Sequence, residues 1–298
     1  MVNKNCKLHH CIAFIIISLL AVVLMTGCED EEPEIYDFST VSDDFLQSYV
    51  AYFHLFFHVD QMLKSVEDSL VVHPEGSYAW RDATVSIQPA IPAEYPKTFR
   101  LDFGTTGADD VIAGAITGVV SADYLSEGAA VTYTFEDVII NRDRPSGSCS
   151  VTNEGLSSGK QLFHFEITDN TLVRDADTDT AYAVLLAGFQ NVLWSQKDDV
   201  LTIPTGTYTG QSLTSDSLRF MAEVDPDYKL IKDSDCDYIR DGIFDFRVRK
   251  NTTNTEIGDG VVDFGFMNPM DCDQYVIAVV DGEANRTEFV YLMDWVKF

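Results

Sequence analysis

The sequence predicts a mainly β protein, built as an antiparallel meander or sandwich with one N-terminal amphipathic helix. Over residues 80–298, short runs of apolar residues alternate with polar ones, which is typical of half-buried strands. Residues 41–73 instead repeat apolar side chains every three or four positions, as one face of a helix does. Because 46% of the residues are hydrophobic and 12% aromatic, the chain has ample material for a folded core.

The chain opens with a signal peptide, residues 1–27. Two lysines precede an apolar run over 12–25, which is too short to cross a bilayer comfortably, since a spanning helix needs about 20 apolar residues. The run ends in Leu-Met-Thr-Gly-Cys at 24–28, which resembles the lipobox of bacterial lipoproteins. This resemblance implies cleavage before Cys28 and attachment of lipid, such as palmitate, to its thiol. The alternative is an uncleaved anchor helix.

Residues 28–40 form an acidic tether. The segment Glu-Asp-Glu-Glu-Pro-Glu-Ile-Tyr-Asp at 29–37 has too little apolar surface to fold. Acidic residues directly after a lipidated cysteine resemble the surface-export signal of Bacteroidetes lipoproteins, and a plain solvated linker is the other interpretation. The resemblance implies a protein anchored by lipid in the outer membrane and facing the extracellular side.

The charge balance argues against one class of partner. The chain has 20 basic and 48 acidic residues, a net charge of −28, and loss of residues 1–27, which hold two lysines and no acid, takes it to −30. Nucleic-acid binding needs clustered lysine and arginine, so we expect no nucleic-acid partner. We expect contact with the membrane through the N-terminal lipid, and a glycan or a protein as the class of ligand.

The predicted helix, 41–73, begins at Ser42 or Asp43, either of which can cap it, and ends before the sequence Pro-Glu-Gly at 74–76. Its apolar side chains form a broad aromatic face that must pack on another element. They are Phe45, Tyr49, Tyr52, Phe53, Phe56, Val59, Met62, Leu63 and Val66.

The predicted β-domain spans residues 80–298, with Tyr182 to Trp194 as the one stretch whose type is ambiguous. Turn signals containing glycine, aspartate or asparagine separate its strands. They are Ser146-Gly147, Asp169-Asn170, Asp241-Gly242, Asp259-Gly260 and Asp281-Gly282. The alternating apolar sets are Val85/Ile87, Phe99/Leu101/Phe103, Val131/Tyr133/Phe135, Phe163/Phe165/Ile167, Phe244/Phe246/Val248 and Val262/Phe264/Phe266.

Residues 243–267 are predicted to form a hairpin around a polar loop at 250–256. Matching the apolar sets of its two strands pairs Phe246 with Phe264 and Val248 with Val262, and places Arg247 opposite Asp263. A slip by one residue would turn each phenylalanine to the wrong face, so the prediction is specific.

Several motifs occur together in a fixed order and resemble an uncharacterised family of Bacteroidetes outer-membrane lipoproteins over roughly residues 98–282. They are Asp102-Phe103-Gly104, Gly114-Ala115-Ile116-Thr117-Gly118, Tyr124, Gly128, Val151-Thr152-Asn153-Glu154-Gly155, Trp194, Gly206, Cys236, Gly242, Asp263-Phe264-Gly265 and Cys272-Asp273. The resemblance implies an extended antiparallel β-domain and an outer-membrane address, and it supplies no catalytic residues. The chain departs from the family near the first Asp-Phe-Gly, where the glycine-aspartate loop is only Gly107-Ala108-Asp109-Asp110.

Beyond Cys28 the chain has three cysteines, which allow three pairings. We predict a disulfide between Cys236 and Cys272, because each lies between two aspartates just before a strand, and we predict that Cys149 is unpaired. This bridge would gather four carboxylates in one place. They form either a solvated rim or a weak calcium site, and calcium is the one cofactor the sequence suggests. The four are Asp235, Asp237, Asp271 and Asp273.

Other motifs give weaker indications of chemistry. His54 and His58 have the spacing of a helical zinc pair but lack the glutamate that a metalloprotease places after the first histidine. The run 175–179 has three alternating aspartates without the rest of a calcium loop. Tryptophans that can stack on sugars are Trp80, Trp194 and Trp295, and matches to the Bacteroidetes O-glycosylation pattern are Asp68-Ser69-Leu70, Asp179-Thr180-Ala181 and Asp216-Ser217-Leu218.

Together these observations predict a non-enzymatic surface lipoprotein that acts as a binding or structural module. A fimbrillin-like pilus subunit is one alternative, weakened because no basic residue for proteolytic maturation follows Cys28 before Lys64. A glycan-binding or hydrolase accessory protein is the other.

Overall fold

A computed structural model describes residues 36–105, 112–213, 218–233, 236, 238–265, 275–283 and 285–292. The chain divides into two compact units, Met1–Ile35 and Tyr36–Phe298, and the described residues all belong to the second. Its elements are α2 (Ser39–Val72), β1 (Ser77–Trp80), β2 (Ala83–Gln88), β3 (Lys97–Asp102), β4 (Ile112–Val120), β5 (Ala130–Ile140), β6 (Arg144–Ser157), β7 (Lys160–Arg174), β8 (Tyr182–Ser195), β9 (Val200–Ser212), β10 (Leu218–Val224), β11 (Leu230–Asp233), β12 (Ile243–Lys250), β13 (Glu256–Asp263), β14 (Tyr275–Gly282) and β15 (Arg286–Leu292).

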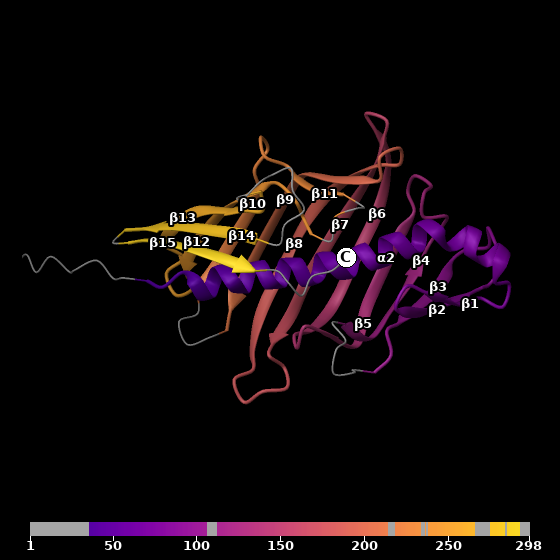
Figure 1. The fold of residues 1–298 in the computed structure, drawn as a ribbon, viewed down its shortest axis with the longest axis horizontal. Coiled ribbons are helices and arrows are strands. Elements are labelled where there is room, and N and C mark those ends of the chain that lie inside the picture. Colours follow the sequence, from indigo (N-terminus) through magenta and orange to yellow (C-terminus); the bar gives the residue numbers. More distant parts are fainter. Residues whose placement is uncertain are drawn as a thin grey trace, which may run out of the picture. The chain divides into compact units, whose positions relative to one another are not determined.

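The predicted fold class is confirmed, and the sheet is a meander rather than a sandwich. The described strands form one 15-stranded antiparallel sheet in which neighbours in sequence pair with each other (Figure 1). The exception is β11, which pairs with residues 200–203 of β9, while β10 pairs with residues 207–211 of the same strand. The ambiguous stretch from Tyr182 to Trp194 belongs to strand β8.

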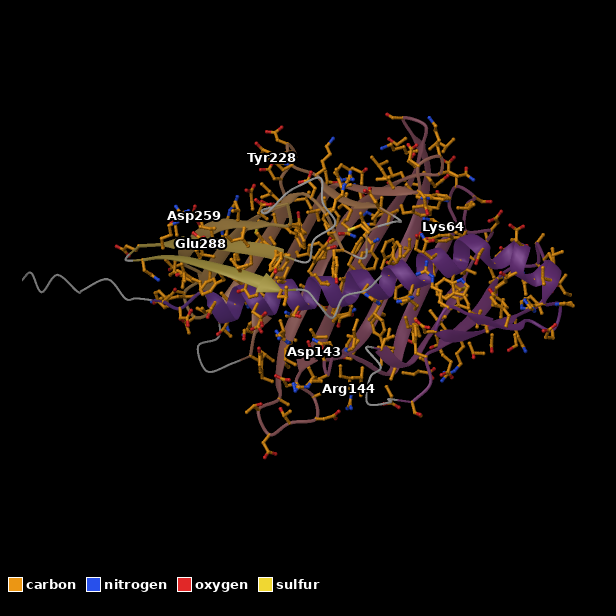
Figure 2. All side chains as sticks on the ribbon, viewed as in Figure 1. Lys64, Asp143, Arg144, Tyr228, Asp259 and Glu288 are labelled. Atoms are coloured by element: carbon orange, nitrogen blue, oxygen red, sulfur yellow. The ribbon has the colours of Figure 1, made fainter. Side chains whose placement is uncertain are left out.

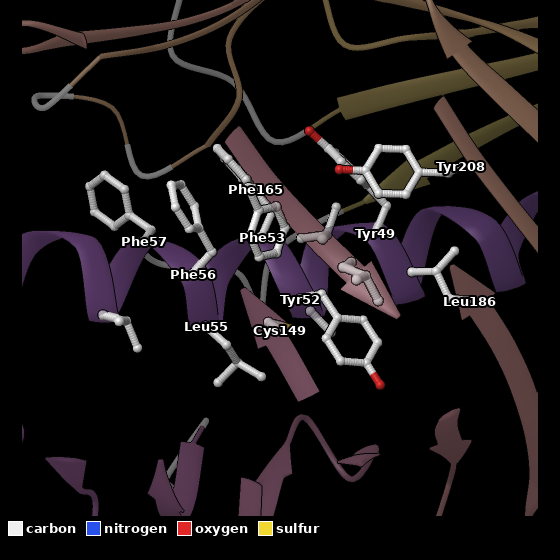
Figure 3. Packing of buried hydrophobic residues seen from close by; sticks show 14 of the residues in the cluster. Tyr49, Tyr52, Phe53, Leu55, Phe56, Phe57, Cys149, Phe165, Leu186 and Tyr208 are labelled. Atoms are coloured by element: carbon white, nitrogen blue, oxygen red, sulfur yellow. The ribbon is translucent and has the colours of Figure 1, made fainter. Parts of the chain in front are cut away.

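Helix α2 crosses the strands along the length of the sheet (Figure 1). The residues from Ser48 to Asp60 are all buried, which is more than three turns, so this part of the helix is enclosed on every side instead of burying one stripe. The aromatic side chains explain this, because they leave the helix in several directions and each meets ring or aliphatic side chains (Figure 3). Centroid distances are 4.7 Å for Phe56–Phe165, 4.9 Å for Tyr49–Phe244, 5.2 Å for Phe45–Phe244 and 5.7 Å for Tyr52–Phe135.

Two of the predicted turns lie inside long strands as β-bulges. The dipeptide Ser146-Gly147 is within β6 and Asp169-Asn170 is within β7, and the pairing of these two strands shifts between Ser146 and Ser148. Gly147 has a φ of 101°. The side-chain oxygen of Asn170 accepts a hydrogen bond from Ser148 N at 2.8 Å. These residues do bend the backbone locally, as turn residues do, but both strands continue through the bulge.

The predicted register of the hairpin at 243–267 is wrong, although its faces are right. Phe246 lies opposite Gly260 and Val248 opposite Gly258, while Arg247 pairs with Asp259 rather than Asp263. The displacement is an even number of residues, so Phe246 and Phe264 both remain in the core. The cause is that the Asp-Gly at 259–260 continues β13 instead of turning. At Gly258, a Cβ atom would lie 2.9 Å from Cζ of Phe38, so its hydrogen leaves room for that ring.

Within the described residues, no helix combines the length and the apolar character that crossing a membrane requires.

Candidate functional site

Most of the predicted site residues lie outside the described residues. These are the lipidation site Cys28, the predicted bridge partner Cys272 and the four carboxylates of the calcium hypothesis, Asp235, Asp237, Asp271 and Asp273. Cys236 is described and is buried. Its bridge to Cys272 and the calcium site therefore stay predictions.

Cys149 is a free, buried thiol, as the sequence predicts. It lies on β6 in the core close to Tyr52 of the helix (Figure 3), and its Sγ accepts a hydrogen bond from Asn170 Nδ2 at 3.4 Å. Burial raises the pKa of the thiol to about 12. The thiol therefore stays protonated at neutral pH and is a core side chain rather than a nucleophile.

His54 and His58 are buried in the core, with their Nε2 atoms 2.8 Å apart. The His58 ring also packs against Phe103 and Trp80, with centroid distances of 5.4 and 6.0 Å. Burial lowers the pKa of both imidazoles, and nearby Arg81 lowers it further. The two Nε2 atoms are within hydrogen-bonding distance of each other, at the one-turn spacing that the sequence shows.

Arg174, near the end of β7, joins three carboxylates around the start of α2. Its guanidinium lies 3.0 Å from Asp43 and from Asp143 and 3.3 Å from Asp44. Burial raises the pKa of Asp143 to about 6 and also raises that of Asp44, whose Oδ1 accepts a 2.7 Å hydrogen bond from the Tyr182 hydroxyl. The cluster ties the helix to the sheet.

The aspartates of the run 175–179 belong to an exposed turn, consistent with the solvated alternative. Two of them face arginines, since Asp175 lies 3.7 Å from Arg142 and Asp177 lies 3.6 Å from Arg144. Figure 2 shows Asp143 and Arg144 where β6 begins. Among the described residues, no group of three or more histidine, cysteine, aspartate or glutamate side chains is arranged to hold a metal ion.

The two described tryptophans already have side chains over or beside their rings. Lys64 Nζ lies 3.9 Å from the Trp194 ring centroid, and the indole donates a 2.9 Å hydrogen bond to Asp199. Arg81 stacks 4.9 Å from the Trp80 ring. Trp295 lies outside the described residues. Of the glycosylation matches, Ser69 is inside α2 and Thr180 is on an exposed turn.

The outer face of the sheet carries a groove of about 580 Å³ across β2, β3, β4 and β5, which we call the hydroxyl groove. Its outward side chains are mainly short hydroxyls in neighbouring register positions, with Thr117 directly opposite Thr134 and their Oγ1 atoms 3.4 Å apart. Arg100 lies beside Thr117 and forms ion pairs with Glu136 and, at 3.2 Å, with Asp102. The outward lining consists of Ser86, Gln88, Thr98, Arg100, Thr117, Val119, Thr132 and Thr134.

A second outer groove of about 570 Å³ crosses β8, β9, β10 and β12, and we call it the arginine groove. It has an apolar floor and a pair of arginines at one end. Its lining consists of Asp169, Leu185, Leu186, Ala187, Thr209, Gly210, Gln211, Arg219, Phe220, Met221, Arg249 and Asn254.

Neither groove was apparent from the sequence, although the alternating set Val131/Tyr133/Phe135 implies that Thr132 and Thr134 lie on the opposite face of their strand. No family model, no curated protein and no solved structure matches the chain.

Proposed function

We propose that this protein is a lipid-anchored surface protein of the outer membrane that acts as a non-enzymatic binding module, and that the hydroxyl groove binds a glycan. The observation that carries the proposal is the groove itself, because it gathers hydrogen-bonding side chains from four strands on one exposed face. The anchor rests on the lipobox at 24–28 and the acidic residues that follow it.

The chemistry of the hydroxyl groove suits a sugar. Serine and threonine hydroxyls both donate and accept hydrogen bonds, as sugar hydroxyls do, and Gln88 adds an amide. Strands in a sheet lie about 4.8 Å apart. Gln88 and Thr98 are on adjacent strands and Thr132 lies two strands further on, so the three side chains form a row of hydrogen-bonding groups. Arg100 is held by two carboxylates, which fixes its guanidinium for further hydrogen bonds.

The placement of the titratable groups supports binding rather than catalysis. His58 and Cys149, whose pKa values shift strongly through burial, lie in the core and line neither groove. A general base must reach the reacting proton, and these groups are enclosed.

The anchor is tested by Cys28→Ala in the intact chain. The variant should lack the lipid mass and leave the membrane fraction after a carbonate wash. Persistence of the variant in the washed membranes would exclude anchoring through this thiol.

The binding surface is tested with the full-length lipoprotein in detergent on an array of neutral oligosaccharides. Paired substitutions Thr117→Val and Thr134→Val remove two hydroxyls while keeping the β-branched shape that strands favour. Binding should weaken at least tenfold. The matched control is Thr207→Val on β9, an outer-face position that lines neither groove. Equal glycan binding by both variants would exclude the hydroxyl groove.

One observation favours the pilus subunit as a second candidate. Among the described strands, β15 pairs only with β14, and its Val290 and Leu292 are 57% and 45% exposed. An exposed apolar edge strand is a surface on which another chain can add a strand. Filaments of the purified protein in negative stain, lost on Val290→Lys, would support assembly over glycan binding.

A further inference from the structure

Two arginines face each other directly across the outer side of strands β10 and β12. Arg219 and Arg249 are register partners, so their Cβ atoms are about 5 Å apart. Like charges directly opposite each other destabilise a sheet. The pairing is unexpected for this composition, because the chain has only 20 basic residues and 48 acidic ones. An acidic residue opposite either arginine would be both more favourable and more common.

Both guanidinium groups retain hydrogen-bonding capacity. Arg219 is exposed and makes no ion pair with any described residue. Arg249 Nη2 lies 3.3 Å from Glu256 Oε2, but its Nε is buried and has no hydrogen-bond partner within the described part of the chain. The two arginines and Glu256 together leave one uncompensated positive charge at this end of the groove.

The rest of the arginine groove continues from this pair across the sheet. Gln211 lies beside Arg219, and Leu185 lies beside Gln211 on the next strand. In the adjacent row of paired positions, Met221 on β10 lies opposite Thr209 on β9. The groove thus offers amide and hydroxyl groups over an apolar floor.

The nearby acidic groups among the described residues do not cancel the charge of the pair. Glu223 lies 3.6 Å from Arg247, which occupies the neighbouring row on β12. Asp169 lines the far end of the groove at the bulge of β7. It is three strands away from Arg219, or about 14 Å, which exceeds the screening length of about 8 Å at physiological ionic strength.

We propose that the arginine groove binds a carboxylated sugar unit, such as a uronate. The planar carboxylate accepts hydrogen bonds from Arg219 and Arg249, as arginine forks favour. The sugar hydroxyls bond to Thr209 and Gln211, and the apolar ring face packs on Leu185 and Met221. A single carboxylate neutralises the single uncompensated charge, whereas a doubly charged phosphate would leave a net negative charge beside Glu256. The inference deepens the proposed glycan binding but uses a separate set of residues.

The test uses the full-length lipoprotein in detergent and isothermal titration with trigalacturonic acid, its fully methyl-esterified form and inorganic phosphate. The acid should bind at least tenfold more tightly than the ester or phosphate. Arg219→Gln and Arg249→Gln should each weaken binding of the acid at least tenfold. The matched control is Arg286→Gln, which removes the same charge from an exposed residue on β15 and should change binding less than twofold.

Other outcomes decide against the proposal. Equal binding of acid and ester, or a loss in Arg286→Gln as large as in Arg219→Gln, would show that no carboxylate site exists in this groove. Tighter binding of phosphate than of the acid would assign the arginines to a different anion. The melting temperature of Arg219→Gln should stay level or rise, because repulsion from Arg249 is removed, so lost binding will not reflect unfolding.

The two glycan sites can fail separately. Neutral glycan binding that depends on Thr117 and Thr134, with no preference for the acid, would overturn this inference and leave the proposed function standing. Acid binding that depends on Arg219 but not on these threonines would overturn the hydroxyl groove alone.

Discussion

His54 and His58 face each other across one turn of α2, with their Nε2 atoms 2.8 Å apart and both rings buried. One Nε2 donates a hydrogen bond to the other when both rings are neutral. Protonation of either ring would place a charge in the core near Arg81 and Lys232. The pair is therefore a neutral structural element that acid destabilises.

We predict that this pair makes the fold sensitive to mild acid. Burial lowers the pKa of His58 to about 3, while an unfolded chain titrates near 6.5. Between these values the unfolded chain binds more protons, so the free energy of unfolding falls as pH drops below about 6.5. The double variant His54→Leu/His58→Leu should be less dependent on pH between 6.5 and 4, as measured by urea unfolding at each pH. Replacing both partners together avoids leaving one imidazole without its bond.

The control for this experiment is His73→Gln, at the exposed end of α2. Its pH profile should match that of the unmodified protein. A double variant whose profile also matches would mean that the pair does not control acid stability.

Removal of Arg174 should strongly destabilise the fold at neutral pH. Arg174→Met leaves Asp44, which is fully buried, without its cation, and loss of one partner of a buried ion pair costs about 3–5 kcal/mol. Because burial already raises the pKa of Asp143 to about 6, acid neutralises that carboxylate and the loss should be smaller at pH 5 than at pH 7.5. Chemical unfolding at both pH values measures the difference.

Arg144→Met is the matched control for this substitution, because Arg144 is half-exposed and lies 3.6 Å from Asp177. An exposed pair of this kind contributes at most about 1 kcal/mol. Similar losses for the two variants would show that the cluster around Arg174 has no special role.

The bulge that joins β6 to β7 can be tested through Gly147. A Cβ atom there would lie 2.1 Å from Asn170 Oδ1, and the φ of 101° is also unfavourable for alanine. Gly159→Ala is the matched control, since its φ is 78° but nothing lies within 4 Å of the added atom. Gly147→Ala should cost about 1–3 kcal/mol more than the control, the usual range for overpacking. Equal melting temperatures would show that the bulge relaxes freely.

The predicted bridge between Cys236 and Cys272 can be tested by non-reducing peptide mapping. A fragment that joins Cys149 to either of them would refute the pairing. Closing a loop of this length contributes about 3–4 kcal/mol, so reduction should lower the melting temperature markedly.

The calcium hypothesis for the aspartates around these cysteines has a separate test. If the four carboxylates bind calcium, millimolar calcium should raise the melting temperature above that in excess chelator, because a ligand stabilises the state that binds it. An unchanged melting temperature leaves only a solvated rim. Asp235→Asn with Asp271→Asn should abolish any calcium effect while keeping the size of each side chain.

The sequence was sufficient to predict the types of element but not their extent or pairing. The 3.6-residue period located α2, which begins at Ser39 rather than at the predicted Ser42 or Asp43, and alternation located strands such as Phe99–Leu101 and Phe244–Val248. Alternation shows which face of a strand each residue lies on, but it does not determine which residues pair across strands. A register displaced by an even number of residues keeps the same faces, so the error in the hairpin at 243–267 could not be detected from the sequence. Turn residues were also ambiguous, because the same Gly147 that favours a turn also permits a bulge.

The candidate sites were beyond sequence reasoning for a related reason. Arg219 and Arg249 are 30 positions apart, and only the register of β10 with β12 makes them neighbours. The same holds for Thr117 and Thr134, which are 17 positions apart and are brought together by the register of β4 with β5. Histidine spacing, by contrast, is local, and it correctly placed His54 beside His58 while leaving open what they bind.

The enclosure of α2 has a consequence for how the chain acquires its structure during synthesis. The helix precedes the strands, yet Tyr291 on the last described strand donates a hydrogen bond to the Ser39 carbonyl across 252 positions. This aromatic-rich helix is therefore covered completely only once the later strands have been made. Until then part of its apolar surface is exposed, and exposed apolar surface favours aggregation. A chain stopped before β15 would lack the contact that fixes the start of the helix, and such truncated products should be prominent targets for proteases.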